Sequence, residues 1–414
     1  MAETLVPTLQ TADLELLART LQERRTRSVD VVTSAKHIAA SDTDGPRIEL
    51  SGVAPQIEMD ETGVTTTEIS GAYQVSRTGN EGLSAKLEIP SAYLRRLHDE
   101  FPRLWVENIN GWLGHGAPPP AGPVARTPLL LRLLTGQEGA PGVVRAVLSP
   151  NYRFIDDLDV LLAALEGMHA AGVQDPVITA DLTERRMIVR VGVPAVSALA
   201  PGLLAGYRSP FGEEATPRRQ ALERAGWGAM LRSNPRVGDV VYAGFVLTNS
   251  EIGSGAFRLV PQITVLACLN GMTVTHDASR EVHLGAKLDE GVVKMTPELM
   301  KANIDVVKAR TAAAVQTFLD PEYVQAKVRE MERVAGKEID DPPAVIEKLG
   351  RSLGYSKDEQ AGILSMFTKG GQTTAGGIMQ AVTAHAQTVA DRDRAWELES
   401  SGVDALHAAS ALVR

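Results

Sequence analysis

The sequence predicts an α+β protein with a core of antiparallel β-strands and packed helices, followed by an α-helical C-terminal unit. Two observations predict this class. Short β-prone segments separated by Gly, Asp and Asn turn signals recur from Ile48 onward. From Thr296 onward, Ala, Lys, Glu, Val and Leu recur at helical spacing. We therefore divide the chain into N-terminal helices (1–45), an α+β core with an antiparallel sheet (46–292) and a helical C-terminal region (293–414).

The first third of the chain predicts helices, then a small sheet, then another helix. Leu14, Leu17 and Leu21 stand at helical spacing, so we expect one or two helices within 13–40. Residues 48–89 read as an antiparallel sheet or meander. A helix is expected at 91–101, and the Gly/Pro tract at 114–123 predicts a loop.

The middle of the chain carries the strongest strand signals. Apolar segments follow at 127–136 and 142–156, and we expect a helix at 157–171 and a strand pair over 176–194 whose tip spans Asp181 to Arg186. Two long strands follow over 238–274, joined near Gly253-Ser254-Gly255. The C-terminal helices are interrupted at 369–377, and the last helix is expected at 378–399.

Composition narrows the classes of protein. The chain has 414 residues, a formal net charge of −9 and one cysteine, Cys268, which we expect in the core. A single cysteine excludes an intrachain disulfide and a cysteine-based zinc site, and it is typical of a reducing compartment. We expect a cytoplasmic protein without membrane association, because no apolar run approaches a bilayer span. The acidic balance argues against a coat for duplex DNA.

The positive charge is concentrated in two stretches that also carry many aromatic residues. Residues 80–153 hold 8 bases and 6 acids, and residues 181–236 hold 9 bases and 5 acids. All but one of these 17 bases are arginine, and the same stretches contain 8 of the 18 aromatic residues. Arginine binds phosphate and aromatic rings stack on bases, so this composition favours a groove for single-stranded nucleic acid. Buried aromatics and an arginine-rich codon usage remain an alternative explanation.

The candidate nucleic-acid-binding residues come from these stretches and from the following polar turn. Phosphate contacts are expected from the arginines, stacking from Tyr152 and Trp227, and backbone or subunit contacts from the turn. The set is Arg145, Tyr152, Arg153, Arg185, Arg186, Arg218, Arg219, Trp227, Asn249, Ser250, Gly253 and Gly255. The turn from Asn249 to Gly255 could equally be a bulge or corner in a long strand.

Motifs for catalysis, metals and cofactors are missing, so we predict no catalytic residue, no metal site and no cofactor. The chain contains neither a Walker A loop nor GxGxxG, GxSxG or HExxH. His276, Asp277 and His283 form the tightest histidine group, which we interpret as exposed turn residues. The acids at 156, 157 and 159 could hold a divalent cation, but a helix N-terminus also attracts acids.

Two blocks of the sequence resemble a known family. RAVLSPNYRFIDDLDVL (145–161) and VLTNSEIGSGAFRLVPQITVLACLNGM (246–272), preceded by IPSAYLRRL and ENINGWL, are similar to a family encoded by phages, prophages and plasmids, domain of unknown function 932. The match covers about residues 80–300. It implies a mobile-element protein and no catalytic residue. The architecture is also loosely similar to phage single-strand annealing proteins.

These observations support three hypotheses. The first is a non-enzymatic phage or mobile-element protein that binds single-stranded DNA and promotes annealing or recombination as a homo-oligomer. The alternative is a structural or regulatory assembly protein that binds other proteins through its C-terminal helices. The third is an enzyme whose metal or nucleotide site combines Asp156, Asp157, Glu251 and His283.

Overall fold

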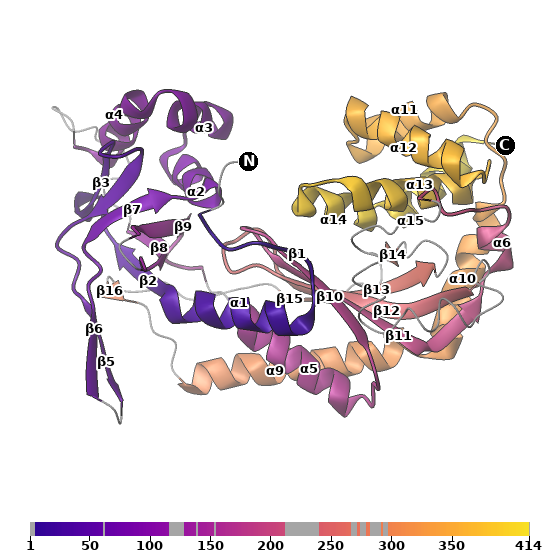
Figure 1. Cartoon of the computed structure of the whole chain (residues 1–414), viewed down its shortest axis with the longest axis horizontal. Coiled ribbons are helices and arrows are strands. Elements are labelled where there is room, and N and C mark those ends of the chain that lie inside the picture. The colour runs from indigo at the N-terminus through magenta and orange to yellow at the C-terminus, as the bar shows by residue number, and fades with distance from the viewer. Residues whose placement is uncertain are drawn as a thin grey trace.

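The computed structural model consists of two large β-sheets side by side, each covered by helices (Figure 1). It describes residues 5–60, 63–115, 128–137, 140–152, 155–211, 240–265, 271–273, 279–281, 291–292 and 297–413. The α+β class predicted from the sequence is confirmed. We call the two sheets sheet A and sheet B.

Sheet A is antiparallel throughout and is covered on both faces. Its spatial order is β1 (Leu9–Ala12), β10 (Val177–Leu182), β11 (Met187–Leu199), β12 (Val240–Asn249), β13 (Phe257–Val265) and β14 (Gly271–Thr273), with β15 (Ser279–Glu281) also paired to β13. Helices α1 (Leu14–Arg27), α5 (Asp157–Ala170) and α9 (Pro297–Phe318) pack on one face. Because both faces are covered, every residue of β12 is buried.

Sheet B has helices on one face and meets sheet A along the other. Its order is β16 (Gly291–Val292), β2 (Ser28–Thr33), β8 (Leu129–Leu134), β9 (Gly142–Leu148), β7 (Gly71–Val75), β4 (Arg47–Leu50) and β3 (Ile38–Ser41). Only β7 and β9 pair in parallel among the described strands. Helices α2 (Arg77–Leu87), α3 (Ser91–Glu100) and α4 (Pro102–Leu113) cover it, and a separate hairpin pairs β5 (Gln56–Asp60) with β6 (Gly63–Thr67).

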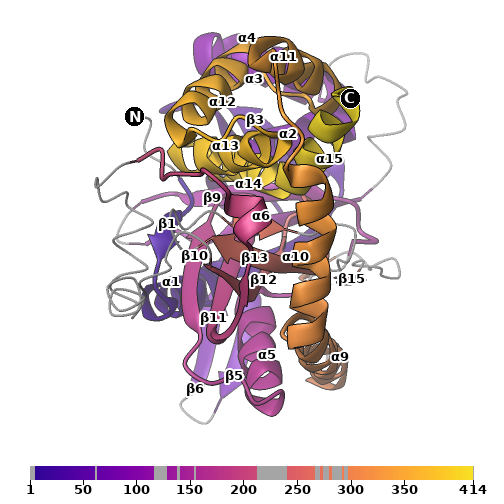
Figure 2. The same ribbon diagram turned by 90° about the vertical axis from the view of Figure 1, so that its right-hand side faces the viewer.

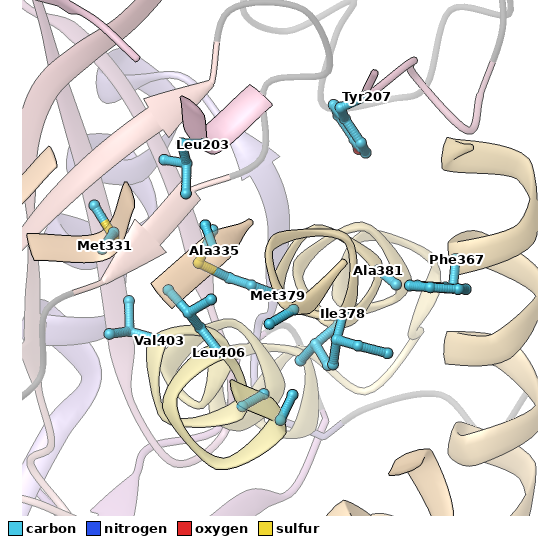
Figure 3. Packing of buried hydrophobic residues seen from close by; sticks show 14 of the residues in the cluster. Leu203, Tyr207, Met331, Ala335, Phe367, Ile378, Met379, Ala381, Val403 and Leu406 are labelled. Carbon is cyan, nitrogen blue, oxygen red and sulfur yellow. The ribbon is translucent and has the colours of Figure 1, made fainter. Parts of the chain in front are cut away.

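The C-terminal helices share a hydrophobic core with the second face of sheet A. They are α10 (Pro321–Ala335), α11 (Pro342–Leu353), α12 (Lys357–Gly370), α13 (Ala375–Thr388), α14 (Arg392–Ser400) and α15 (Gly402–Leu412). Figure 3 shows Met331, Ile378 and Leu406 of these helices gathered with Leu203, which belongs to the short helix α6 (Pro201–Leu204). Figure 2 shows α10 running past sheet A from α9 toward α15. Deleting residues 294–414 would therefore expose the core of sheet A.

Most of the predicted elements lie where the sequence places them. The helix at 157–171 is α5, the strand pair with its tip at 181–186 is β10 and β11, and the long strands joined near Gly253 are β12 and β13. The break at 369–377 separates α12 from α13. The region expected as one last helix contains parts of α13 and α14, and α15 follows it. Cys268 lies outside the described residues.

Two segments differ from the prediction. The helix from the first leucines ends at Arg27, and residues 28–33 and 38–41 are the strands β2 and β3. The sequence at 84–89, expected as a strand, lies mostly in α2, which begins after Ser76 caps the amide of Gly79. Tertiary packing explains both differences, because β2 pairs with β8 and Leu83 and Leu87 of α2 pack on sheet B.

Candidate functional site

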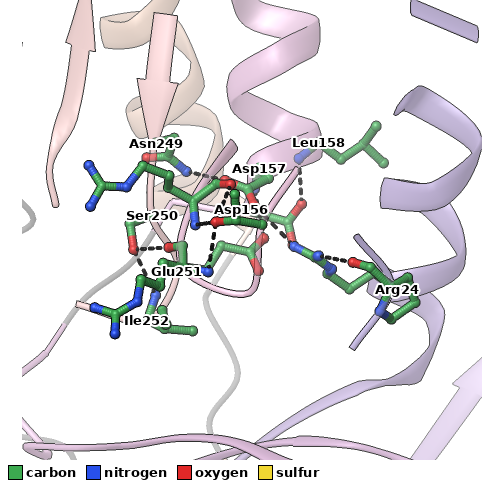
Figure 4. A network of polar contacts seen from close by, with 12 residues as sticks. Arg24, Asp156, Asp157, Leu158, Asn249, Ser250, Glu251 and Ile252 are labelled. Atoms are coloured by element: carbon green, nitrogen blue, oxygen red, sulfur yellow. Dashed lines mark hydrogen bonds and ion pairs between the residues drawn. The ribbon is translucent and has the colours of Figure 1, made fainter. Parts of the chain in front are cut away.

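A buried cluster of arginines and carboxylates joins the two sheets (Figure 4). Glu251, in the turn after β12, stands at its centre. We call it the Glu251 cluster; its members are Arg24, Asp30, Arg132, Arg145, Asp156, Asp157, Asn249 and Glu251. These residues come from α1, β2, β8, β9, the segment entering α5, and the end of β12. The turn after β12 therefore fastens sheet A to sheet B.

Glu251 binds sheet B through two arginines. Arg145 donates a hydrogen bond of 2.9 Å from Nη1 to Oε2 of Glu251, and Arg132 donates one of 2.9 Å to its backbone oxygen. The backbone amide of Asp157 donates to Oε1 at 2.8 Å. The side chains of Arg132, Arg145 and Glu251 are only 2–4% exposed. In this conformation Arg145 is therefore unavailable to a phosphate in solvent, contrary to its predicted role.

A β-bulge aims Arg145 at the cluster. In the pairing of β8 with β9, Arg132 lies opposite Ala146 and Leu133 lies opposite Val144, so Arg145 is the extra residue. A bulge changes which face of the sheet the following residues occupy. Val144 and Val147 consequently both pack under the helices of sheet B, while Arg145 joins Arg132 on the face toward sheet A.

The acids at the start of α5 bind protein groups rather than a cation. Asp157 accepts a hydrogen bond of 2.8 Å from Nδ2 of Asn249 and lies 3.5 Å from Nη1 of Arg24. Asp159 pairs with Arg25 at 2.6 Å, and Asp156 accepts from the amide of Leu158. The arginines around Asp157 and Glu251 supply the positive charge that a metal ion would bring. His283, the fourth residue of the predicted enzyme site, lies outside the described residues.

The carboxyl groups of the cluster have very different pKa values. Burial alone would raise the pKa of Glu251, but Arg132, Arg145 and Arg24 lower it to about 2. Burial and the negative charge of Glu251 raise the pKa of Asp156 to about 6. Burial and Glu251 likewise hold the pKa of Asp157 well above its ordinary value. Glu251 is therefore the permanently charged member of the group.

We expect the raised pKa of Asp156 to appear as a pH dependence of stability. Between its ordinary value of 3.8 and about 6, the folded state binds a proton more tightly than the unfolded state, so stability falls as pH rises through this window. A shift of this size corresponds to about 2–3 kcal/mol. Urea unfolding of Asp156→Asn between pH 4 and 6 should show a shallower decline than the unchanged protein, and equal slopes would contradict the assignment.

A second buried network joins sheet A to α14. Arg190 of β11 contacts Asp181 of β10 at 2.7 Å and Glu399 of α14 at 2.8 Å. Gln262 of β13 donates to Glu399 at 2.8 Å, and Arg392 lies 3.2 Å from Asp181. Burial would raise the pKa of Asp181, but Arg190 and Arg392 lower it to about 2. This network, which we call the Arg190 network, fixes α14 over the sheet.

The turn from Asn249 to Gly255 is a structural corner that positions two neighbouring segments. Ser250 donates from Oγ to the backbone oxygen of Arg185 at 2.7 Å. The amide of Gly253 donates to the hydroxyl of Tyr152 at 3.0 Å, and that hydroxyl donates to the oxygen of Ser250 at 3.2 Å. Gly253 has φ +83°, which favours glycine. Of the two interpretations left open by the sequence, the corner is the one observed.

A cleft of about 780 Å³ opens where sheet A, sheet B and the C-terminal helices meet. We call it the junction cleft. Figure 1 places α2 and α3 on one side, the start of α14 on the other, and β1 between them. Its lining includes Arg77 and Glu81 of α2, Arg95 of α3, Arg185 of the turn between β10 and β11, and Arg392. Clefts between lobes are the common location of binding sites.

The carboxylates of the cleft are mostly occupied by internal partners. Glu81 pairs with Arg185, Asp393 pairs with Arg186 at 2.8 Å, and Asp391 caps the first amides of α14. Arg95, in contrast, has no ion-pair partner within the part of the chain that the structure describes. The cleft contains more acids than bases, and Arg95 is an exposed guanidinium among them.

The structure separates the predicted nucleic-acid-binding residues into three groups. Arg145, Asn249 and Ser250 are buried and hold the lobes together, so they are scaffold residues in this conformation. Arg185 lines the cleft, Arg186 and Tyr152 make the internal contacts given above, and Gly253 and Gly255 are exposed. The third group, Arg153, Arg218, Arg219 and Trp227, lies outside the described residues, as do His276, Asp277 and the tract at 116–123.

Arg77, Glu81 and Arg95 were missed as candidates. Arg77 falls in the net-acidic N-terminal segment, so charge counting concealed it, while Arg95 was one of many arginines in 80–153. A weak signal existed, because α3 and α4 expose aromatic side chains in the same region. Tyr93, Phe101 and Trp112 are 44–48% exposed, whereas Trp105 is fully buried and donates to Asn80 at 2.9 Å.

Comparison of the chain with family models, with curated proteins and with solved structures found no match. Across the described ranges, no group of three or more His, Cys, Asp or Glu residues is arranged to hold a metal ion. No described helix combines the length and apolar character that crossing a membrane requires.

Proposed function

We propose that the protein binds single-stranded DNA in the junction cleft without catalysing a reaction on it. The observation that carries the proposal is the convergence of Arg77, Arg95 and Arg185, from three separate segments, on one cleft. Guanidinium groups are the preferred protein partners of phosphate. The side chains of Arg77 and Arg185 are 57% and 31% exposed, so both are within reach of a ligand.

Aromatic side chains on α3 and at the start of α4, outside the residues that line the cleft, offer the second element of such a site. The helix that carries Arg95 also exposes Tyr93, and Arg96 lies 5.9 Å from the ring centre of Phe101 at the start of α4. Stacking on rings accommodates any base, whereas charged residues follow the backbone. Single-stranded DNA offers both features, because its bases are free to stack and its phosphates form a continuous chain.

Salt-dependent binding of a fluorescent oligonucleotide tests the proposal. Each phosphate contact on a single strand contributes about −0.7 to the slope of log K against log salt, so three arginines predict a slope near −2. Arg95→Ala should weaken binding several-fold and make the slope shallower by about 0.7. Fluorescence anisotropy from about 50 to 200 mM salt measures both quantities.

The matched control is Arg351→Ala. Arg351 is an exposed arginine of α11, away from the cleft, so its removal should leave the affinity unchanged. Absence of salt-sensitive binding by the unchanged protein at about 50 mM salt, where phosphate contacts are strongest, would refute the proposal.

Annealing, recombination and homo-oligomer formation belong to the same proposal. Electron micrographs of the protein with and without DNA should then show rings or filaments.

A further inference from the structure

One carboxylate in the junction cleft is held by two guanidinium groups. Both oxygens of Glu81 lie 2.6 Å from Nη2 of Arg185, and Oε1 lies 3.5 Å from Nε of Arg77. The Glu81 side chain is 26% exposed, so the group is open to the cleft rather than buried in the core. Two cations therefore surround a single internal anion that solvent can reach.

The ion pair between Glu81 and Arg185 connects the helices of sheet B with sheet A. Glu81 and Arg77 belong to α2 above sheet B, whereas Arg185 belongs to the turn of sheet A, 104 residues further along the chain. The backbone of this turn is fixed, because Thr183 accepts hydrogen bonds from the amides of Arg185 and Arg186 and Ser250 donates to the oxygen of Arg185. The Arg185 side chain can change partner while its backbone stays in place.

A phosphate group matches the surroundings of this carboxylate. It offers the same negative charge and more acceptor oxygens, and two guanidinium groups with five N–H donors each can satisfy them. Arg95, which also lines the cleft, would add a third cation to an extended phosphodiester chain. These partners suit a polyphosphate or nucleic-acid backbone better than a neutral ligand.

We propose that Arg77 and Arg185 form a phosphate subsite that the Glu81 carboxylate occupies in the free protein, and that a phosphodiester displaces Glu81 when it binds. The identity of the ligand rests on the proposed function. Glu81 then acts as an internal competitor, because each binding event must first break its ion pairs. The free protein consequently binds more weakly than its arginines would allow.

Glu81→Gln tests this inference, since it keeps the shape of the side chain and removes its charge. Removing the competing charge should tighten oligonucleotide binding about tenfold at about 50 mM salt, while the salt slope stays near −2, because the same three arginines contact phosphate in both proteins. Adding Arg185→Ala to this variant should abolish most of the gain. A structural role alone would not tighten the binding.

Glu347→Gln is the matched control, because Glu347 also contacts two cations, Arg351 at 2.9 Å and Lys357 at 3.5 Å, but does so on the exposed surface of α11. It should change neither affinity nor slope. A Glu81→Gln variant that folds and binds neither the oligonucleotide nor inorganic tripolyphosphate more tightly than the unchanged protein overturns the inference. If Glu81→Gln proves unstable, Glu81→Ala replaces it: it also removes the competing charge and keeps both arginines, and the same tightening is expected.

Inorganic tripolyphosphate separates failure of the subsite from failure of the proposed function. Calorimetric titration should show that Glu81→Gln binds tripolyphosphate more tightly than the unchanged protein does. Tighter binding of tripolyphosphate without binding of DNA would support the subsite and refute the proposed function. Binding of DNA by the unchanged protein with no gain for either probe in Glu81→Gln would refute the subsite alone.

Discussion

Replacing Glu251 by Gln is expected to lower the free energy of unfolding by about 3–5 kcal/mol, the typical loss when one partner of a buried ion pair is removed. The substitution leaves Arg145 without its carboxylate partner and removes one of the negative charges that compensate Arg132. Both arginine side chains are 2% exposed. Water cannot solvate these guanidinium groups where they lie. Urea unfolding at pH 7, followed by circular dichroism, measures the loss.

Two further variants distinguish this explanation from a general sensitivity to substitution. Glu347→Gln removes an exposed carboxylate and should leave the urea midpoint unchanged. Adding Arg145→Met to Glu251→Gln should recover part of the lost stability, because an apolar side chain of similar size needs no counter-charge. A loss below about 1 kcal/mol for Glu251→Gln would mean that the cluster adds little net stability.

Replacing Arg190 by Leu is expected to lower the free energy of unfolding by about 3–5 kcal/mol, because it leaves buried carboxylates without their positive partner. The substitution leaves Glu399 and Asp181 buried without the guanidinium that contacts both. Because Asp181 owes its pKa of about 2 to Arg190 and Arg392, removing Arg190 raises that pKa. Acid should therefore partly rescue the variant.

The effect of Arg190→Leu on stability should depend on pH, because Asp181 titrates differently with and without Arg190. In the unchanged protein the contribution of Asp181 is complete above its ordinary value of 3.8 and is lost as pH falls toward about 2. In Arg190→Leu, protonation of Asp181 relieves part of the uncompensated charge, so the loss in free energy of unfolding should be smaller at pH 4 than at pH 7. Arg351→Leu on exposed α11 serves as control. An equal deficit at both pH values would contradict this account.

The elements that sequence reasoning located correctly are those whose own pattern is strong. Strands β10 to β13 carry β-branched and apolar residues between clear turn signals, and α5 begins at a cluster of acids with Asp156 as its cap. The predictions that were wrong concern segments whose local sequence is compatible with both a helix and a strand. Residues 28–41 continue a helical segment and became strands because β8 and β4 pair with them.

The candidate site was harder to predict than the fold. Arg145 and the turn from Asn249 to Gly255 were both singled out from the sequence, but in the structure Arg145 binds Glu251 of that turn. The bulge that turns Arg145 inward has no signal in the sequence, because it depends on the register between β8 and β9. The cleft residues Arg77 and Arg95 stand in ordinary helical contexts, and the aromatic residues between 93 and 112 were a weak signal for Arg95 alone.

The sequence alone determined the α+β class, the helical C-terminal region and the concentration of arginines in two stretches. Those properties depend on the periodicity and composition of short stretches of sequence, so residues close together in the chain are enough to determine them. Tertiary structure alone decided which arginines are buried against carboxylates and which face the cleft. The physical reason is distance along the chain: Arg145 meets Glu251 across 106 residues and Arg190 meets Glu399 across 209, so only folding determines whether a guanidinium ends beside a carboxylate or in solvent.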